Sequence, residues 1–331
     1  MEMNQRIVLA SRPKGEVTAD NFRLEQVPLP SLNDGEVLVR NHYMSLDPYM
    51  RGRMDDAKSY AAPQALDQVM GGGTVGEVVQ SRNSAYAVGD QVVGQGGWQL
   101  FSVDNGKGMR KVDTQHVPLS AYLGAVGMPG VTAWYGLNQI IGPKAGETVV
   151  VSAATGAVGS VVGQLAKLKG CRVVGLAGGA EKCAIVVKEF GFDACIDYKA
   201  GKLYEDLREA TPKGIDGYFD NVGGVVLDNV LRRMNAFGRL AICGLISSYN
   251  GEPMSVTNFR SVLVNRLKVE GFIVSEHMQH WPAALAELGS LVGTGKLKFR
   301  ETVAQGLAAA PQAFGGMLAG KNIGKQVVKL V

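Results

Sequence analysis

The chain has 331 residues, 46% of them apolar, which is too long for one small core and indicates roughly two domains. Its 34 basic and 30 acidic residues give a net charge of +4 without a dense Lys or Arg run, which argues against a nucleic-acid partner. The 44 glycines exceed the usual share of about 7% and predict many tight turns and places where backbone approaches a ligand.

The cysteines and the N-terminus indicate a reducing compartment. Cys171, Cys183, Cys195 and Cys243 form no CxxC pair and are not clustered with histidines, which argues against a zinc cage. Residues Met1–Gly15 lack the apolar core of a secretory signal. We therefore expect a cytoplasmic protein.

The first part of the chain, from Met1 to about Thr114, has the pattern of an antiparallel β domain. Short alternating or β-branched runs are separated by Gly, Pro, Asn and Asp, and they predict strands at Glu36–Arg40, Gly76–Val79 and Asp90–Val93. The next stretch, Thr114–Pro143, has no charged residue and has the length of a membrane span. Because prolines and glycines interrupt it, we interpret it as buried irregular structure with short helix, and expect no membrane partner.

From Glu147 onward, continuous apolar strands alternate with helix-period segments. The expected strands are Thr148–Ser152, Arg172–Ala177, Ala194–Asp197, Gly217–Asp220, Arg239–Cys243 and Val269–Val274. The expected helices are Val158–Leu168, Glu181–Phe190, Lys202–Ala210, Val225–Met234 and, later, Trp281–Val292. Strands spaced by helices predict an α/β fold with a Rossmann-type, doubly wound parallel sheet.

The C-terminal tail returns to a different pattern. A strand is expected at Phe299–Ala304, a helix at Ala308–Leu318 and a strand at Gly324–Leu330. Because the parallel sheet offers these strands no evident partner, we expect the tail to rejoin the first domain.

A glycine turn between the first parallel strand and its helix indicates a phosphate site. The segment Ser152–Gly159 fits GxGxxG if Ala154 replaces the first glycine. Gly156 then lets backbone amides approach a pyrophosphate at the helix N-terminus, and Gly159 lets helix and strand pack closely. The order strand, turn, helix supports this reading, and a tight turn without a ligand is the alternative.

The end of the second parallel strand indicates which dinucleotide is bound. Gly178 and Gly179 stand where NAD enzymes usually place an acid on the ribose 2′-hydroxyl. Lys182, at the start of the next helix, offers positive charge to a 2′-phosphate, so the sequence predicts NADP(H). The alternative is a solvated Lys182 with Glu181 as the ribose partner. Polar, glycine-containing turns at Asp220–Gly224 and Cys243–Tyr249 follow the next two strands, where ligands collect in open sheets.

Several motifs together resemble the zinc-independent medium-chain dehydrogenase/reductases. They are Ser45–Arg51 (SLDPYMR), Val126–Ala133 (VGMPGVTA), Ala153–Gln164 (AATGAVGSVVGQ), Tyr218–Gly224 (YFDNVGG), Ile242–Asn250 (ICGLISSYN) and Gly324–Val328 (GKQVV). More narrowly, the chain is similar to the prostaglandin reductase, leukotriene dehydrogenase and alkenal double-bond reductase group, which includes bacterial curcumin reductases. The resemblance runs nearly from end to end.

The resemblance implies a domain plan and a set of cofactor contacts. A GroES-like, β-rich catalytic domain would comprise residues 1–125 and the returning tail 298–331, an NADP-binding Rossmann domain residues 126–297, and the cofactor would lie between them. The chain would act as a homodimer joined at the edges of the parallel sheets, near Phe272–Val274. The implied cofactor residues are Met128 and Thr132 near the nicotinamide, Gly156, Ala157 and Val158 at the phosphates, Lys182 and Tyr198 near the 2′-phosphate, then Asn221, Cys243, Gly244, Leu245, Ile246, Ser247, Ser248, Tyr249, Phe272, Ile273, Val274 and Asn322.

Zinc ligands of the wider superfamily have no counterpart here. A ligand Cys and a Gly-His-Glu segment are expected in that superfamily, and the matching regions are Ser45–Asp47 and Gly71–Gly76. The histidines, including His277 and His280, have no cysteine or carboxylate at metal spacing. We therefore predict an enzyme without a bound metal.

The expected reaction is reduction of an activated C=C bond in an enone or alkenal. A hydrogen-bond donor at the substrate carbonyl would stabilise the enolate, and Tyr49 is the leading candidate for a catalytic and substrate-binding residue, with Tyr249 second. For each tyrosine, a packing role is the alternative. Eukaryotic members carry a further tyrosine in the segment that matches Ser261–Val269, and none is present here. The proton donor is thus open, and an NADPH quinone oxidoreductase or a non-catalytic NADPH-binding protein are the rival functions.

Overall fold

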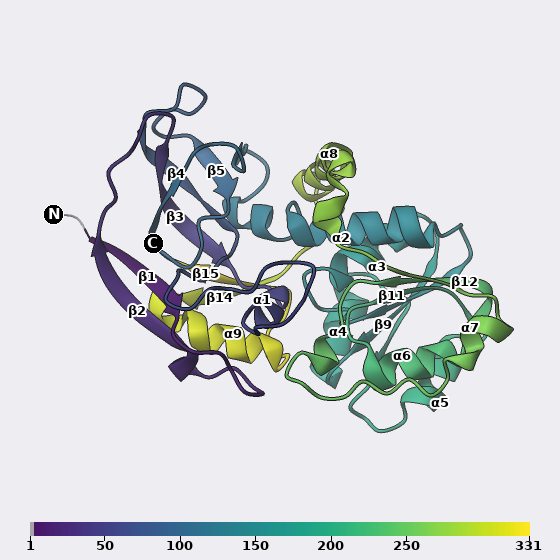
Figure 1. The fold of residues 1–331 in the computed structure, drawn as a ribbon. Helices are drawn as coiled ribbons and strands as arrows, with labels where there is room; N and C mark the ends of the chain where they lie inside the picture. Colours follow the sequence, from purple (N-terminus) through teal and green to yellow (C-terminus); the bar gives the residue numbers. More distant parts are fainter. Residues whose placement is uncertain (1–2) are drawn as a thin grey trace. The chain divides into compact units, whose positions relative to one another are not determined.

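The computed structural model describes residues 3–331, which divide into two compact units. The first contains residues 3–123 together with Glu301–Val331, and the second contains Gly124–Arg300. The boundaries expected from the sequence were after residues 125 and 297. Each unit has its own sheets (Figure 1).

The first unit is built on a seven-stranded sheet in the order β14-β15-β3-β4-β5-β7, with β6 paired to β3, and on a separate hairpin, β1-β2. The strands are β1 (Met3–Leu9), β2 (Phe22–Pro28), β3 (Val37–Ser45), β4 (Thr74–Ser81), β5 (Gln91–Gly94), β6 (Phe101–Asp104), β7 (Arg110–Lys111), β14 (Glu301–Gln305) and β15 (Lys325–Lys329); the helices are α1 (Tyr49–Arg53) and α9 (Ala310–Leu318). The strands of the N-terminal part pair antiparallel, as predicted. The hairpin strands and α1 were not among the expected elements.

The tail belongs to this first unit because β15 adds to its sheet. Val328 of β15 pairs antiparallel with Met44 of β3, and β14 then pairs with β15. In the core of this unit, Trp98 stacks on Phe22 at 5.2 Å and meets the edge of Phe314 of α9 at 5.6 Å. The rings belong to a core cluster that also contains Met44 of β3 and Met50 of α1.

The second unit is a six-stranded parallel sheet in the order β10-β9-β8-β11-β12-β13, the doubly wound order predicted from the sequence. Its strands are β8 (Thr148–Ser152), β9 (Arg172–Ala177), β10 (Ala194–Asp197), β11 (Ile215–Asp220), β12 (Met234–Ile242) and β13 (Lys268–Gly271). Its helices are α2 (Met128–Tyr135), α3 (Gly159–Leu168), α4 (Ala180–Lys188), α5 (Leu203–Ala210), α6 (Gly224–Leu231), α7 (Arg260–Val264) and α8 (Trp281–Gly293). Helices cover both faces of this sheet (Figure 1).

Three expected boundaries in this unit are wrong by three residues or more. The helix predicted to reach Met234 ends at Leu231, because the backbone of Met234 pairs with Ile215 and starts β12 five residues before the expected strand. The strand predicted for Val269–Val274 ends at Gly271, whose partner Ile242 is the last residue of β12. Val274 instead begins a short 3-10 turn that ends at Glu276.

The uncharged stretch before the parallel sheet forms a buried, broken helix. A 3-10 turn at Leu119–Leu123 precedes α2, which continues as one π-helical segment, Gly136–Ile141, and ends at Gly142 with φ of 52°. Buried irregular structure with short helix was expected here, and the structure has short helical segments with a turn at residues 124–127 between them. None of the helices in residues 3–331 combines the length and the hydropathy of a membrane-spanning segment.

Candidate functional site

The carboxyl ends of β8 and β11 are tied together at the point where the strand order of the sheet reverses. Asn221 donates from its backbone N–H to Ser152 Oγ and from Nδ2 to the Ser152 carbonyl, both at 2.8 Å. Ser152 Oγ in turn donates to Asp220 Oδ1 at 3.0 Å. Doubly wound sheets bind ligands in the crevice at this reversal, and these bonds hold Asn221 beside it.

Asp220, the last residue of β11, is fully buried and organises the loop after it. Its Oδ1 also accepts bonds from Tyr218 Oη at 2.8 Å and from the amides of Val222 and Gly223 at 2.9 and 3.0 Å. Its Oδ2 has no partner among the described residues. Burial raises the pKa of Asp220 above its usual value, although these donors oppose that rise.

The backbone of the predicted phosphate turn is closely packed at two positions, Gly156 and Gly159. Gly156 donates its N–H to the Ala153 carbonyl at 2.8 Å, and Ala153 itself adopts a left-handed φ of 49°. A Cβ on Gly159, the first residue of α3, would lie 2.4 Å from the Ala153 carbonyl oxygen. The close approach of helix and strand predicted for Gly159 is thus confirmed. Ala157 and Val158 complete the turn, and the N-terminal amides of α3 project from it.

Tyr198 and Lys199 converge over the glycine at the end of β9. A Cβ on Gly178 would lie 2.8 Å from Tyr198 Oη and 2.9 Å from Lys199 Cε. Asp197 fixes the turn beneath them, because its Oδ1 accepts the amides of Gly179 at 2.8 Å and Lys199 at 3.0 Å. Its carboxylate is therefore engaged by backbone donors.

Two lysines share this corner of the sheet. Partial burial lowers the pKa of Lys182, the nearby Lys199 ammonium lowers it further, and Glu181 opposes both. A phosphate beside Gly178 would relieve the repulsion between the two cations, whereas a neutral ribose hydroxyl would not. Sequence reasoning missed Lys199. Its position directly after Tyr198 was the available signal, but only the packing of β10 beside β9 brings it toward Lys182.

The loops after β11 and β12 are hydrogen-bonded into one rim. Ser247 donates its N–H and its Oγ to the Val222 carbonyl at 3.1 and 2.6 Å, and Cys243 donates its N–H to the Asp220 carbonyl at 2.8 Å. Tyr249 Oη folds back over the loop and accepts the Leu245 amide at 3.3 Å. The structure thus brings together Asn221 and the loop residues predicted at the cofactor, namely Cys243, Gly244, Leu245, Ile246, Ser247, Ser248 and Tyr249.

The remaining predicted cofactor residues of this unit lie around α2 or beyond β13. Thr132 Oγ1 donates to the Met128 carbonyl, one turn earlier in α2, at 2.8 Å. The buried ring of Phe272 lies 5.4 Å from Tyr135 and 6.2 Å from Phe219, so it packs in the core. Ile273 follows it, and the Val274 carbonyl accepts Trp281 Nε1 at 3.1 Å.

In the first unit, Tyr49 is a partly buried residue at the start of α1. The guanidinium of Arg53, one turn later, lies 5.0 Å from the centre of its ring. Burial raises the pKa of Tyr49, and the nearby Asp47 and Tyr60 raise it further while Arg53 opposes them. Its hydroxyl therefore stays protonated at neutral pH and is able to donate a hydrogen bond. Tyr60 is a second hydroxyl near Tyr49 that sequence reasoning missed.

A buried ion pair holds the segment that leads into Tyr49. Lys325 Nζ lies 3.1 Å from Asp47 Oδ1, and the two side chains are 4% and 7% exposed. Lys325 also donates to the carbonyls of Leu46 at 2.5 Å and Gln326 at 2.9 Å, while Ser45 Oγ donates to Asp47 Oδ2. The tail motif around Lys325 is thereby locked to the motif around Tyr49. Asn322, just before β15, donates from Nδ2 to the Gly324 carbonyl at 2.8 Å.

The histidines of interest lie against aromatic rings. The rings of His277 and His280 lie 4.2 and 5.5 Å from that of Tyr135. Over residues 3–331, no group of three or more His, Cys, Asp or Glu side chains is placed to hold a metal ion.

A doubly wound unit with a glycine turn at its strand reversal, in one chain with an antiparallel β unit, defines a medium-chain dehydrogenase/reductase architecture. A family model described as "N-terminal domain of oxidoreductase" matches residues 5–112, and one described as "Zinc-binding dehydrogenase" matches residues 157–290. The chain is 46% identical to the NADPH-dependent curcumin reductase of Escherichia coli (strain K12), over 99% of this chain and 97% of that protein. It is also 46% identical to prostaglandin reductase 1 of Rattus norvegicus, over 96% of each chain.

A solved structure gives the same result. The NADPH complex of CurA from Vibrio vulnificus superposes with a TM-score of 0.94 at 46% identity, covering 99% of each chain. The chain belongs to the medium-chain dehydrogenase/reductase family, in its zinc-independent prostaglandin reductase and curcumin reductase group.

Proposed function

We propose that this protein is an NADPH-dependent reductase of the activated C=C bond of α,β-unsaturated ketones and aldehydes. The observation that carries the proposal is the identity of 46% over 99% of the chain to an NADPH-dependent curcumin reductase. The alkene class follows from chemistry: a reductase of this group needs an acceptor whose carbonyl takes up the charge that develops on reduction.

The residues at the carboxyl end of the parallel sheet fit NADP(H). The turn Gly156–Val158 would hold the pyrophosphate. The missing Cβ of Gly178 lets Tyr198 and Lys199 pack against the end of β9, where they and Lys182 would bind a 2′-phosphate. Asn221 and the loop Cys243–Tyr249 would line the next part of the cofactor, with Met128, Thr132, Phe272, Ile273, Val274 and Asn322 as further proposed contacts. When bound, NADPH supplies the hydride for the reduction.

Tyr49 is the proposed hydrogen-bond donor at the substrate carbonyl. A tyrosine hydroxyl is protonated at neutral pH, and burial raises the pKa of Tyr49 further, so this hydroxyl is available to donate a hydrogen bond to a developing enolate oxygen. The Lys325–Asp47 pair would hold the backbone before α1 and so fix where this hydroxyl points. Tyr249 is proposed as a second substrate contact, and its hydroxyl is already oriented by the Leu245 amide.

The test of the reaction class is the structure of the product. The protein is incubated with NADPH and an apolar enone, such as a long-chain alkenal or a curcumin-like diketone, and the product is examined by proton NMR. We expect the vinyl signals to disappear while the aldehyde or ketone persists. An allylic alcohol as the main product would overturn the proposal, and turnover of quinones alone would assign the chain to quinone reduction instead.

The test of Tyr49 separates catalysis from cofactor binding. Tyr49→Phe should lower kcat by roughly 10 to 1000-fold, the range expected for one donor to a developing oxyanion, and leave the Kd of NADPH unchanged. Tyr122→Phe, which removes a hydroxyl bonded to the Asp113 carbonyl in the same unit, is the matched control and should retain its rate. Unchanged turnover in Tyr49→Phe would remove Tyr49 from the mechanism.

We further propose a cytoplasmic homodimer joined at the free edge of β13. All four cysteines are unpaired, which suits a reducing compartment. In support of the dimer, β13 pairs only with β12 among the strands of this sheet in residues 3–331, and Val269 on it is 43% exposed. Sedimentation equilibrium of the parent and of Val269→Glu tests this, because a charge at the joined edges should yield monomers.

A further inference from the structure

Cys183 and Cys195 lie next to the proposed 2′-phosphate site, and the thiol of each shifts the pKa of the other. Cys183 follows Lys182 in the first part of α4, and Cys195 lies in β10, a few residues before Tyr198 and Lys199. Both side chains are only partly buried, so small oxidants have access to them.

Strand register independently places the two thiols on the same side of the sheet. Cys195 pairs with Gly175 of β9, and paired residues of parallel strands point to the same face. Val186 of α4 covers that face, because its Cγ1 lies 2.9 Å from where a Cβ on Gly175 would be. Cys183 is three residues before Val186 and therefore lies on the same face of α4, over β10.

We propose that Cys183 and Cys195 form a peroxide-sensitive dithiol, a modification site whose oxidation to a disulfide weakens cofactor binding at the adjoining lysines. The effect on the cofactor rests on the proposed function, whereas formation of the disulfide does not. The oxidant is of the hydroperoxide class, with hydrogen peroxide as the probe.

The chemistry balances with two thiols and one peroxide. The Cys183 thiolate attacks one peroxide oxygen, the O–O bond breaks, and hydroxide leaves with its electron pair as a sulfenic acid forms. The Cys195 sulfur then attacks the Cys183 sulfur, the S–O bond breaks, and water leaves. Overall, two S–H bonds and one O–O bond break, while one S–S bond and two O–H bonds form. The products are the disulfide and two water molecules, and the dithiol gives two electrons to the peroxide.

The environments of the two thiols assign their order of reaction. The Cys195 thiol lowers the pKa of Cys183, against the opposing effect of burial, whereas the Cys183 thiol and burial raise the pKa of Cys195. Cys183 is therefore the thiolate that meets peroxide first, and Cys195 is the resolving thiol. The other two cysteines differ: Cys171 donates to the Lys144 carbonyl at 3.5 Å, and burial raises the pKa of Cys243 to about 12.

A disulfide would move the residues that the 2′-phosphate site needs. An S–S bond is about 2.05 Å long, shorter than a contact between two thiols, so its formation draws Cys183 of α4 toward Cys195 of β10. Lys182 moves with Cys183, while Asp197 holds the Gly179 and Lys199 amides in place. The geometry that sets the two ammonium groups around Gly178 is then lost.

The experiment treats the whole protein with hydrogen peroxide and maps its peptides without reduction. We expect one cross-linked peptide pair, Cys183 to Cys195, with a loss of two hydrogen atoms that a thiol reductant reverses. Cys183→Ser and Cys195→Ser should each abolish the cross-link, and Cys171→Ala is the matched control that should retain it. The Kd of NADPH, measured by titration, should rise at least threefold on oxidation of the parent and should not change in Cys195→Ser treated in the same way.

The reverse measurement follows from linkage. If the disulfide weakens NADPH binding, saturating NADPH must disfavour the disulfide by the same factor, so the equilibrium with a glutathione redox buffer shifts at least threefold toward the dithiol. Oxidation of Cys183 without a cross-link to Cys195 would overturn the dithiol. A cross-link that leaves the NADPH Kd unaltered would overturn its coupling to the cofactor, and reduced protein that fails to bind NADPH would overturn the proposed function while the cross-link stands.

Discussion

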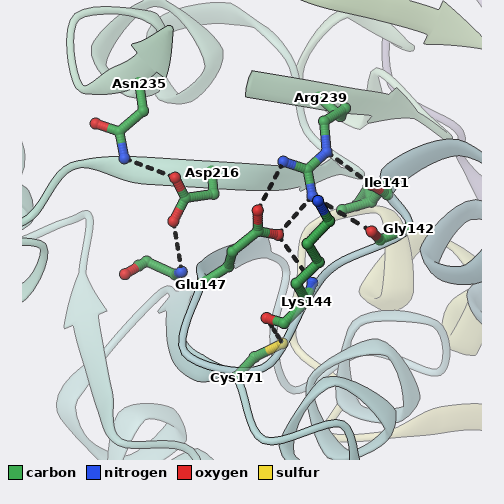
Figure 2. A network of polar contacts seen from close by, with 9 residues as sticks. Ile141, Gly142, Lys144, Glu147, Cys171, Asp216, Asn235 and Arg239 are labelled. Carbon is green, nitrogen blue, oxygen red and sulfur yellow. Dashed lines mark hydrogen bonds and ion pairs between the residues drawn. The ribbon is translucent and has the colours of Figure 1, made fainter. Parts of the chain in front are cut away.

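The two ends of the parallel sheet in the second unit use their polar residues in opposite ways. At the amino end, Arg239 donates to both oxygens of Glu147, at 2.6 and 3.2 Å, and to the Ile141 carbonyl at 2.8 Å (Figure 2). Asp216 beside them accepts the Thr148 amide and Asn235 Nδ2. At the carboxyl end, Asp220 keeps a buried oxygen without a partner in residues 3–331, and Lys182 and Lys199 repel each other.

This difference separates stability from recognition. Charges at the amino end are matched by neighbours and hold β8, β11 and β12 to one another. Like charges and tight glycine backbone at the carboxyl end cost stability unless a ligand matches them. Substitutions at the two ends should therefore change different measured quantities.

The largest effect is expected at the carboxyl end, from adding one methyl group to the phosphate turn. Gly159→Ala places a Cβ within 2.4 Å of the Ala153 carbonyl oxygen, so backbone must move, and the free energy of unfolding should fall by about 1–3 kcal/mol. NADPH binding should weaken with it because the turn is displaced. Chemical denaturation and cofactor titration measure both, and Gly108→Ala, whose Cβ meets nothing within 4 Å, is the control. If Gly159→Ala kept the parent's free energy of unfolding and Kd of NADPH, the turn would be loosely packed and the prediction would be wrong.

Removing the ion pair at the amino end of the sheet should lower the free energy of unfolding without changing the Kd of NADPH. Arg239→Met leaves Glu147 and the Ile141 carbonyl without their donor, and since the pair is about one-fifth exposed we expect a loss of roughly 1–2 kcal/mol, below the value for fully buried pairs. The exposed pair of Arg300 and Glu189 supplies the control, because Arg300→Met should cost less than about 1 kcal/mol. A change in the NADPH Kd of Arg239→Met would break the distinction between the two ends.

The two ends should also respond to acid with opposite sign. Burial raises the pKa of Glu147, but the bonds from Arg239 and the Lys144 amide outweigh it and lower the pKa below 4.5. Its stabilisation is present above about pH 4.5 and is lost as the pH falls through the lowered value. Asp220, with a raised pKa, instead favours the folded state as the pH falls through its pKa. Melting temperatures from pH 3 to 7 should fall less steeply on the acid side in Glu147→Gln than in the parent, and more steeply in Asp220→Asn.

The smallest effect is expected from removing metals. Dialysis against a strong chelator should change neither activity nor melting temperature, because no zinc ligand set was found in the sequence. Elemental analysis of the purified protein accompanies it. One zinc per chain, or activity that zinc restores, would contradict the metal-free prediction.

Patterns local to the chain predicted much of the site. The glycine turn after β8 and the turns after β11 and β12 could be found because a parallel strand, its turn and its helix follow one another in sequence. The long-range partners could not be found this way. Lys325 Nζ reaches the Leu46 carbonyl across 279 residues, and nothing local marks Lys325 as buried. Lys199 likewise becomes a neighbour of Lys182 only when β10 pairs with β9.

Boundaries were missed where strand pairing outweighed local pattern. Met234 continues the helical apolar period of α6, yet it starts β12 because its backbone pairs with Ile215. Phe272 and Val274 have β-forming side chains, but β13 ends at Gly271 because its partner strand ends at Ile242. In both cases a neighbour distant in sequence decides the element.

The most direct test of the account is the discrimination between NADPH and NADH by Lys182 and Lys199. The Kd of each cofactor is measured by titration for the parent, for Lys182→Ala and for Lys199→Ala. The control is Lys167→Ala, which removes an ammonium group of α3 that is paired with Asp193. NADPH should bind the parent at least about tenfold tighter than NADH, a difference of about 1.4 kcal/mol, and each of the first two variants should narrow that gap without lowering the melting temperature. Equal affinities in the parent, or an unchanged gap in both variants, would contradict the assignment of this corner of the sheet to the 2′-phosphate.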